Sequence, residues 1–304
     1  MLKKNLLVAA LVGYVASASA APLLSKHVLV VEEGSGQVLY QKNADATVPI
    51  ASLTKLMTAM VVLDANPDMD ESISIENPEL ATRMHSHSRL PLGTTLPRRT
   101  VLQLALMASD NRAAESLARA YPGGMDAFLA AVAAKEQALG MLHTHIEEPT
   151  GLSPNNRSTA ADLVRMAQAA AQYPEIARIT TDSGDVVDVN GRPLEYHNTN
   201  RLVGRKGWED SILLSKTGTT NAAGRCLLMR VQAAGRTITL VLLNAKAGAA
   251  RFLDAMKIRS FVSGETSMAM LDAPEPRRAR SSVSHFHRVK AHHRVRMSIA
   301  SRAT

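Results

Sequence analysis

Ser52-Leu-Thr-Lys55 opens a segment, residues 52–65, in which apolar residues recur at helical spacing. We expect Ser52 to begin this helix, because serine is a favoured residue at a helix start. Lys55 then lies about one turn later on the same face. A lysine whose pKa is lowered, by burial or by a second cation, can remove the proton of a serine hydroxyl. The stretch is compatible with a serine nucleophile and its own base, but taken alone it is much more often a capping serine followed by a solvated lysine.

Two later motifs favour the catalytic interpretation. Ser109-Asp-Asn111 separates two helical stretches, and Lys216-Thr-Gly218 lies on a strand. The Ser109 hydroxyl can pass a proton, and the Asn111 amide can hold both a peptide carbonyl and a lysine. Lys216 supplies a second cation, and two neighbouring ammonium groups lower each other's pKa, which would make Lys55 a base. Gly218 lets a substrate backbone approach the strand, whose edge can pair with an extended peptide.

Composition narrows the function classes. The 304 residues are enough for one large domain or two modest ones, and 46% of them are hydrophobic. Only 3% are aromatic, which disfavours stacking platforms for single-stranded nucleic acid. The net charge of +8 belongs to residues 277–304, which hold eight basic and no acidic residues, whereas residues 1–276 hold 27 of each. We therefore predict no nucleic-acid partner. The single cysteine, Cys226, allows no internal disulfide and is expected to be a buried thiol.

The first twenty residues match a secretory signal peptide. Lys3 and Lys4 give a positive start, residues 6–15 are apolar, and Ala18-Ser-Ala20 is a small-residue cleavage site. Since the apolar run is too short to span a membrane, we favour cleavage near Ala21 over an uncleaved anchor.

Hydrophobic periodicity divides the rest of the chain into strands, helices and strands again. Residues 27–31 and 37–41 are predicted to form a hairpin that joins three later strands in one antiparallel sheet. The fold class is therefore α/β of the α+β type, with about five strands flanked by helices. The later strands are predicted at 212–215, 226–232 and 237–243, and the helices at 52–65, 100–108, 112–120, 125–139, 159–172 and 251–262.

Taken in this order, the three motifs resemble those of the serine penicillin-binding proteins and β-lactamases. The segments 49–59, Pro149-Thr-Gly-Leu152 and Ser158-Thr-Ala160 are similar to those of low-molecular-weight DD-peptidases. The segments 109–114, 198–202 and 223–227 resemble the DD-endopeptidase branch. The resemblance spans about residues 25–262. It implies a transpeptidase-like fold with an added all-helical subdomain, and a catalytic domain at 21–272 followed by a basic, disordered tail at 273–304.

The resemblance also implies a mechanism that needs no metal or cofactor. Ser52 attacks the carbonyl of a D-Ala residue in a peptidoglycan stem peptide, Lys55 takes its proton, and Ser109 relays a proton to the leaving amine. The backbone N–H groups of Ser52 and Thr219 form the oxyanion hole, and water then releases the acyl-enzyme. An arginine after the late strands holds the substrate carboxylate, with Arg251 preferred over Arg225. The implied catalytic residues are Ser52, Lys55 and Ser109, and the substrate-binding residues are Asn111, Lys216, Thr217, Gly218, Thr219 and Arg251.

Departures from the family pattern favour one branch. After residue 262 the chain is too short for the second β-rich domain of the carboxypeptidases, and the basic tail is no apolar anchor. This favours a periplasmic endopeptidase that cuts D-Ala–diaminopimelate cross-links, with a D-Ala-D-Ala carboxypeptidase as the alternative. Residues 147–152 lack the Glu-x-x-Leu-Asn pattern of class A β-lactamases, so β-lactams are expected to inhibit covalently and persistently. The tail could contact anionic lipid or cell-wall polymer.

Two other functions compete with this interpretation. His85-Ser-His87 and His143-Thr-His145 could each place two rings on one strand face for a metal, but no acidic motif accompanies them, so surface histidines are expected. A wall-binding protein without catalysis is the second alternative. Among single residues, Asp162 and Arg119 are expected on solvated helix faces, and Trp208 could either touch substrate or pack a loop.

Overall fold

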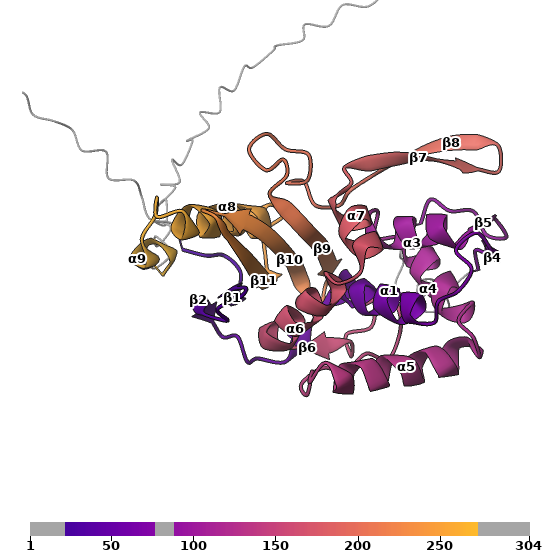
Figure 1. Ribbon diagram of the computed structural model, residues 1–304, viewed down its shortest axis with the longest axis horizontal. Coiled ribbons are helices and arrows are strands. Elements are labelled where there is room, and N and C mark those ends of the chain that lie inside the picture. The colour runs from indigo at the N-terminus through magenta and orange to yellow at the C-terminus, as the bar shows by residue number, and fades with distance from the viewer. Residues whose placement is uncertain (1–21, 77–87, 273–304) are drawn as a thin grey trace, which may run out of the picture.

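The computed structural model describes residues 22–76 and 88–272. At its centre is a five-stranded antiparallel sheet with the strand order β2-β1-β11-β10-β9 (Figure 1). The two early strands pair with the late ones through β1 and β11, where Val28 lies opposite Leu242. This confirms the predicted sheet. Its strands are β1 His27–Glu32, β2 Val38–Lys42, β9 Ile212–Thr220, β10 Gly224–Ala233 and β11 Arg236–Ala245.

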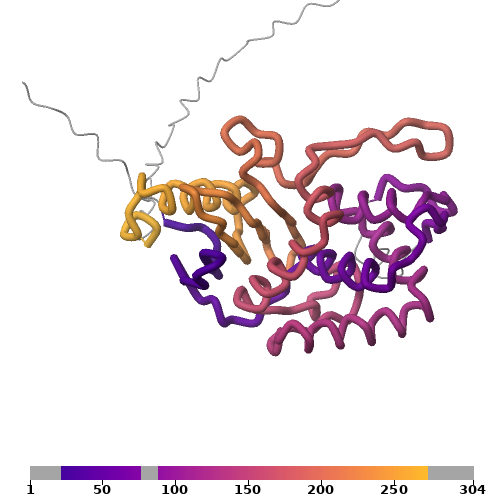
Figure 2. The backbone as a smooth tube through the Cα atoms, viewed as in Figure 1, coloured from indigo at the N-terminus to yellow at the C-terminus, as the bar shows by residue number. Residues whose placement is uncertain are grey.

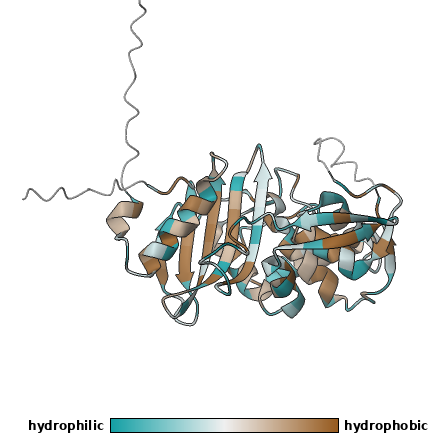
Figure 3. Cartoon of the chain, turned by 90° about the horizontal axis from the view of Figure 1, so that it is seen from above, coloured by the Kyte–Doolittle hydropathy of each residue, from teal (hydrophilic) through white to brown (hydrophobic). Residues whose placement is uncertain are grey.

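Both faces of the sheet are buried, because side chains alternate between two cores. Val28 and Val30 face α8 (Ala250–Val262), whose Phe252 belongs to the same core, whereas Leu29 faces the opposite core. Helix α6 (Ala160–Ala170) contacts the sheet through β1, β10 and β11. Figure 3 shows the apolar stretches of the strands in brown, with α8 packed across them. The expected closing helix is thus present and covers one face.

The helical region lies beyond the β9 edge of the sheet (Figure 1). Helix α1 is its centre: residues 54–62 are all buried, as expected of a helix surrounded by others. The chain returns from this region to the sheet at β9. The first and last described segments lie side by side: Leu23 N–H donates to Leu271 O over 3.1 Å, and Figure 2 shows the indigo and yellow segments together. The helices of this region are α1 Thr54–Asp64, α3 Arg98–Leu106, α4 Asn111–Arg119 and α5 Gly124–Ala138.

Several elements were not predicted. Residues 182–200 form a protruding hairpin, and its turn at Asn190-Gly191 is a standard hairpin signal that the prediction passed over. The hairpin carries exposed apolar residues such as Val186, so the alternation of a half-buried sheet is weak there. The unpredicted elements are β3 Val48–Pro49, β4 Ser72–Ser74, β5 Thr95–Pro97, β6 Arg157–Ser158, α7 Pro174–Thr181, β7 Gly184–Val189, β8 Arg192–His197 and α9 Met268–Leu271.

Four single residues for which the sequence predicts an environment lie in the described chain. Cys226 is fully buried, as predicted. Trp208 is buried in the core beneath α8, with the Arg259 guanidinium 4.6 Å from its ring centroid, so it packs a loop. Arg119 is partly exposed and pairs with Glu115. The expectation for Asp162 is wrong: its carboxylate is buried, and it accepts hydrogen bonds from the His143 N–H and from the Thr144 hydroxyl.

Some predictions fall outside the described residues. These are the signal peptide at 1–20, the basic tail at 273–304, and the pair His85 and His87. Over residues 22–76 and 88–272, none of the helices has both the length and the apolar character needed to cross a bilayer.

Candidate active site

Ser52 and Lys55 lie within hydrogen-bonding distance at the start of the central helix. Ser52 belongs to a 3-10 turn, η1 (Ala51–Leu53), that leads directly into α1. Lys55, in the first turn of α1, donates from Nζ to Ser52 Oγ over 3.1 Å. Ser52 is at the start of the helical segment as expected, but it is not the capping residue, because it lies inside the 3-10 turn and the N-cap positions are Ile50 for η1 and Leu53 for α1. The hydroxyl is therefore left for chemistry, while the partly exposed Ser52 remains open to solvent.

Two glycines hold the turn that presents Ser52. Ala51 has a φ of 50°, a left-handed conformation that costs a non-glycine residue free energy. A Cβ atom on Gly151 would lie 2.0 Å from Ala51 O, and one on Gly218 would lie 2.9 Å from Ala51 Cβ and 3.0 Å from Ser52 N. Gly218 was expected to make room for substrate. In the structure it makes room for the turn that carries the nucleophile.

Lys55 is buried and hydrogen bonded on three sides. Besides Ser52 it donates to Asn111 Oδ1 over 2.6 Å and to Thr150 O over 2.7 Å. Burial lowers the pKa of Lys55 to about 8, against the opposing charges of Glu148 and Asp110. A fraction of Lys55 is therefore neutral near neutral pH and able to accept a proton.

Ser109 and Lys216 form a second hydrogen-bonded serine–lysine pair. Ser109 has a φ of 58° in the link between α3 and α4, and Lys216 Nζ donates to its Oγ over 2.8 Å. Burial is the main cause that holds the pKa of Lys216 well below its ordinary value, with the charges of Lys55 and Arg251 adding to the shift. The predicted mutual effect of the lysines thus acts on Lys216, whereas burial explains Lys55.

The motif that contains Lys216 lies on β9, an edge strand paired only with β10 in the described sheet. Thr217 is buried and its hydroxyl donates to Thr199 Oγ1 over 2.7 Å, which ties the strand to the 198–202 segment. Thr219 is exposed at the strand end. The free edge beside Ser52 can therefore receive an extended peptide through backbone hydrogen bonds.

Arg251 reaches this motif from α8, and Arg225 does not. Arg251 Nη1 donates to Gly218 O over 2.7 Å and to Thr219 Oγ1 over 2.9 Å. Its Nε has no hydrogen-bond partner among the described residues. Burial lowers the pKa of Arg251 to about 10. Arg225 instead donates to Lys246 O at the surface, so of the two arginines only Arg251 contacts Gly218 and Thr219.

The sequence interpretation missed Glu148, which orders the loop that binds Lys55. Glu148 accepts hydrogen bonds from the N–H groups of Thr150, Gly151 and Ser153, and from the Asn156 amide. It thereby fixes the loop whose Thr150 carbonyl binds Lys55. The signal was a carboxylate directly before the Pro149-Thr-Gly turn, a position at which an acidic side chain can accept from following backbone N–H groups.

The histidine pair considered for a metal has no further ligands in the described chain. His143 and His145 are both exposed. Within residues 22–76 and 88–272, no three His, Cys, Asp or Glu side chains are grouped closely enough to hold a metal ion.

Comparisons with known proteins agree with this geometry. A family model described as D-alanyl-D-alanine carboxypeptidase matches residues 14–247. The chain is 45% identical over 242 residues to a D-alanyl-D-alanine endopeptidase of Pseudomonas aeruginosa, covering 79% of this chain and 77% of the relative. It is 41% identical over 256 residues to a D-alanyl-D-alanine endopeptidase of Escherichia coli, covering 84% and 81%. A penicillin-binding protein of Listeria monocytogenes, solved with cefotaxime and with ampicillin bound, is 26% identical with a TM-score of 0.67, covering 79% and 97%.

Proposed function

This chain belongs to the D-alanyl-D-alanine carboxypeptidase family and is a serine-type D-Ala-D-Ala hydrolase, and we propose that it cuts D-Ala–diaminopimelate cross-links of peptidoglycan through an acyl-enzyme on Ser52. The observation that carries the proposal is the hydrogen bond from a buried Lys55, with its pKa lowered to about 8, to Ser52 Oγ. A neutral amine at that position converts a weak hydroxyl into a nucleophile.

Acylation uses both Ser–Lys pairs. Ser52 Oγ bonds to the D-Ala carbonyl carbon while neutral Lys55 accepts its proton, and the carbonyl oxygen becomes an oxyanion. The N–H groups of Ser52 and Thr219 stabilise that charge; losing one such donor typically costs about 100-fold or more in rate. The C–N bond then breaks, and the leaving amine takes a proton through Ser109, which Lys216 holds in place. The product is an ester on Ser52 and a free amine.

Substrate position follows from the open edge of β9. The peptide lies along Thr217–Thr219 as an added strand, and the amide of Asn111 meets one of its carbonyls. A carboxylate next to the scissile bond reaches Thr219 Oγ1 and the guanidinium of Arg251, which is already anchored on Gly218 O. A charge-assisted hydrogen bond of this kind is stronger than a neutral one.

Water completes the cycle by hydrolysing the ester. With β-lactams this step is expected to be slow, because residues 147–152 lack the deacylating Glu-x-x-Leu-Asn pattern. In the structure, Glu147 and Glu148 are engaged with the 150–156 loop. The β-lactam complexes of the Listeria relative support the proposal that these drugs acylate Ser52.

Two observations favour cross-link cleavage over carboxypeptidase activity. The more similar relatives carry the endopeptidase name, and the segments 109–114, 198–202 and 223–227 resemble the DD-endopeptidase branch. A carboxypeptidase that removes a terminal D-Ala uses the same acyl-enzyme and is the alternative. A non-catalytic wall-binding role would not require the hydrogen-bonded pairs Ser52–Lys55 and Ser109–Lys216.

We also propose how the chain is arranged and where it acts. Residues 1–20 direct export and are removed, residues 21–272 form the catalytic domain in the periplasm, and the basic residues 273–304 contact anionic lipid or wall polymer weakly.

The proposal is tested by intact-protein mass spectrometry after exposure to benzylpenicillin, with Ser52→Ala beside the wild type. A stable adduct equal in mass to the drug is expected on the wild type and absent on the variant. Digestion of purified muropeptides then assigns the activity. Conversion of cross-linked dimers to monomers supports the endopeptidase, and release of D-Ala from pentapeptides alone supports the carboxypeptidase. A folded wild type that forms no adduct contradicts the mechanism.

A further inference from the structure

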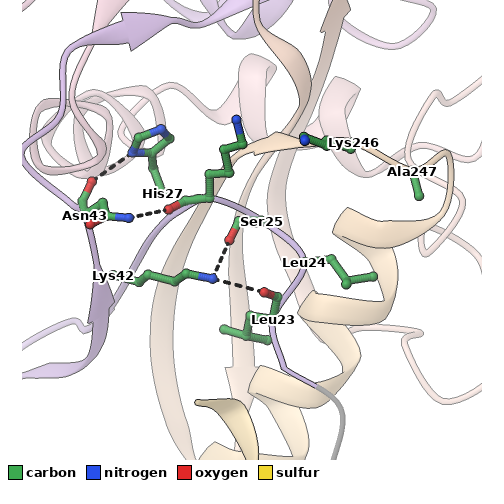
Figure 4. Close-up of a pocket in the computed structure, with 9 residues that line it drawn as sticks. Leu23, Leu24, Ser25, His27, Lys42, Asn43, Lys246 and Ala247 are labelled. Atoms are coloured by element: carbon green, nitrogen blue, oxygen red, sulfur yellow. Dashed lines mark hydrogen bonds between the residues drawn. The ribbon is translucent and has the colours of Figure 1, made fainter. Parts of the chain in front are cut away.

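A cavity of about 470 Å³ opens where β1 begins (Figure 4). None of the described residues that line it belongs to the candidate active site. The cavity is cationic: Lys26, Lys42 and Lys246 line it together with His27, and none of the nine described residues around it is acidic. Since residues 1–276 hold equal numbers of basic and acidic residues, this concentration of lysines is a local feature. A concave site lined by one sign of charge attracts ligands of the opposite sign.

The wall of the cavity is held in place by its own hydrogen bonds. Lys42 Nζ donates to Leu23 O and to Ser25 O, both over 3.1 Å, so its charge is fixed in position without a carboxylate partner in those contacts (Figure 4). Asn43 Nδ2 donates to Lys26 O over 3.0 Å. Behind this wall, the buried Asp254 carboxylate accepts from the N–H groups of Leu24 and Ser25 and from the Ser25 hydroxyl. The segment is therefore rigid before any ligand arrives.

The register of the sheet places this cavity at the same end as the catalytic strand terminus. Thr219 of β9 lies opposite Arg225 of β10, and Arg225 lies opposite Ala245 of β11. The next step across the sheet pairs β11 with β1, where His27 lies opposite Leu243. Three strand spacings separate β9 from β1, a distance of about 14 Å.

Basic side chains lie between the Thr219 end of β9 and the cavity. Arg225 is partly exposed next to Thr219, and its Nη1 donates to Lys246 O over 2.8 Å. The Lys246 side chain is exposed at the cavity, and Lys26 is exposed on its other side. An anionic chain can extend from the active site past Thr219. It would then meet Arg225, Lys246 and Lys26 in turn.

We propose that this cavity is a subsite for the free carboxylates of the second stem peptide, the one that departs as the amine when a cross-link is cut. The inference rests on the proposed endopeptidase function and deepens it. In cross-link cleavage the leaving group is a whole stem peptide that carries carboxylates. In carboxypeptidase cleavage it is a single D-Ala, which extends only about 3.5 Å and cannot reach across three strands.

The test is steady-state hydrolysis of a purified cross-linked muropeptide dimer by the full mature chain and by Lys26→Glu/Lys246→Glu. The expected result is a KM for the dimer about tenfold higher in the variant, the effect of reversing two partly solvated charges. The wild-type KM should also rise with added NaCl more steeply than that of the variant, because salt screens exposed charges. Benzylpenicillin acylation involves no second peptide and reports in both proteins that the fold and Ser52 are intact.

The matched control is Arg192→Glu/Lys206→Glu, which makes the same change in net charge at exposed positions at the start of β8 and before β9. Its KM for the dimer should equal that of the wild type. An unchanged KM in Lys26→Glu/Lys246→Glu overturns the subsite, and so does an equal loss in the control, which would indicate a general charge effect. A wild type that acylates with penicillin but does not cut dimers overturns the endopeptidase proposal itself, and that outcome is visible before any variant is made.

Discussion

The α-carbon of Gly151 packs against the Ala51 carbonyl so closely that a Cβ atom there would lie 2.0 Å from Ala51 O. Gly151 has a φ of 83°, in the left-handed region that favours glycine. The contact joins the loop that binds Lys55, through Thr150 O, to the turn that carries Ser52. The nucleophile and its base are thus positioned by one point of contact as well as by their spacing along the chain.

Gly151→Ala should therefore damage catalysis as well as stability. We expect the free energy of unfolding to fall by about 2 kcal/mol or more, and the rate of benzylpenicillin acylation to fall by about 100-fold, since small displacements of reacting groups have effects of that size. Gly36→Ala is the control: its φ is 70°, but nothing lies within 4 Å of the added Cβ. It should lose about 1 kcal/mol of stability and acylate normally. Equal acylation by the two variants would contradict the role given to Gly151.

The rate of acylation should depend on pH through Lys55. Because burial lowers the pKa of Lys55 to about 8, the neutral base increases about tenfold per pH unit below that value and is about 1% of the total at pH 6. The second-order rate constant for benzylpenicillin acylation should rise with pH and level off above about 8. In Lys55→Arg the side chain stays protonated, so the second-order rate constant for acylation should be at least about 100-fold lower at every pH. A flat profile between pH 6 and 9 would exclude Lys55 as the base.

Glu148→Gln should shift that profile. The negative charge of Glu148 raises the pKa of Lys55, so its removal moves the midpoint of the acylation profile to lower pH. A glutamine side chain has only one oxygen, so it cannot accept from the three backbone N–H groups that bind both carboxylate oxygens of Glu148. The free energy of unfolding should therefore also fall by about 1–3 kcal/mol. Glu147→Gln is the matched control, because among the described residues Glu147 accepts from the side chains of Ser153 and Asn155 rather than from backbone N–H groups. Its midpoint should stay where it is in the wild type.

Much of this architecture could be predicted from local sequence, and the reasons are physical. The short continuous apolar runs of β1 and β11 identify strands buried on both faces, and the three-residue spacing of Ser52 and Lys55 fixes their proximity within one turn. The 3-10 turn was missed because it depends on Gly151 and Gly218, which press on Ala51 from 100 or more residues away. Contacts of that kind leave no periodic signal.

Charged residues show the same limit. Asp162 has the helical spacing of a surface position, yet its carboxylate is buried because the loop that begins at His143 folds over it and supplies an N–H and a hydroxyl. The position of Glu148 before the Pro149-Thr-Gly turn indicates that it can accept from following N–H groups, but its contact with the Asn156 amide depends on how the 150–156 loop folds. Buried polar groups need hydrogen-bond partners, and those partners are known only from the tertiary structure.

Glu136 gives the last prediction, which concerns stability. Its carboxyl is buried, Oε1 has no hydrogen-bond partner among the described residues, and burial raises the pKa of Glu136 to about 7 from an ordinary value of 4.5. Between these two values the folded chain binds more protons than the unfolded chain, so stability is lost as the pH rises from about 4.5 through 7. Glu136→Gln removes the buried charge and should raise the free energy of unfolding at pH 8 by on the order of 1 kcal/mol relative to its effect at pH 5. Urea unfolding at the two pH values measures this difference.

Glu195→Gln is the control, because its side chain is 68% exposed; its effect on the free energy of unfolding should be the same at both pH values. If Glu136→Gln also has the same effect at both pH values, the Glu136 carboxyl titrates normally and the prediction is wrong.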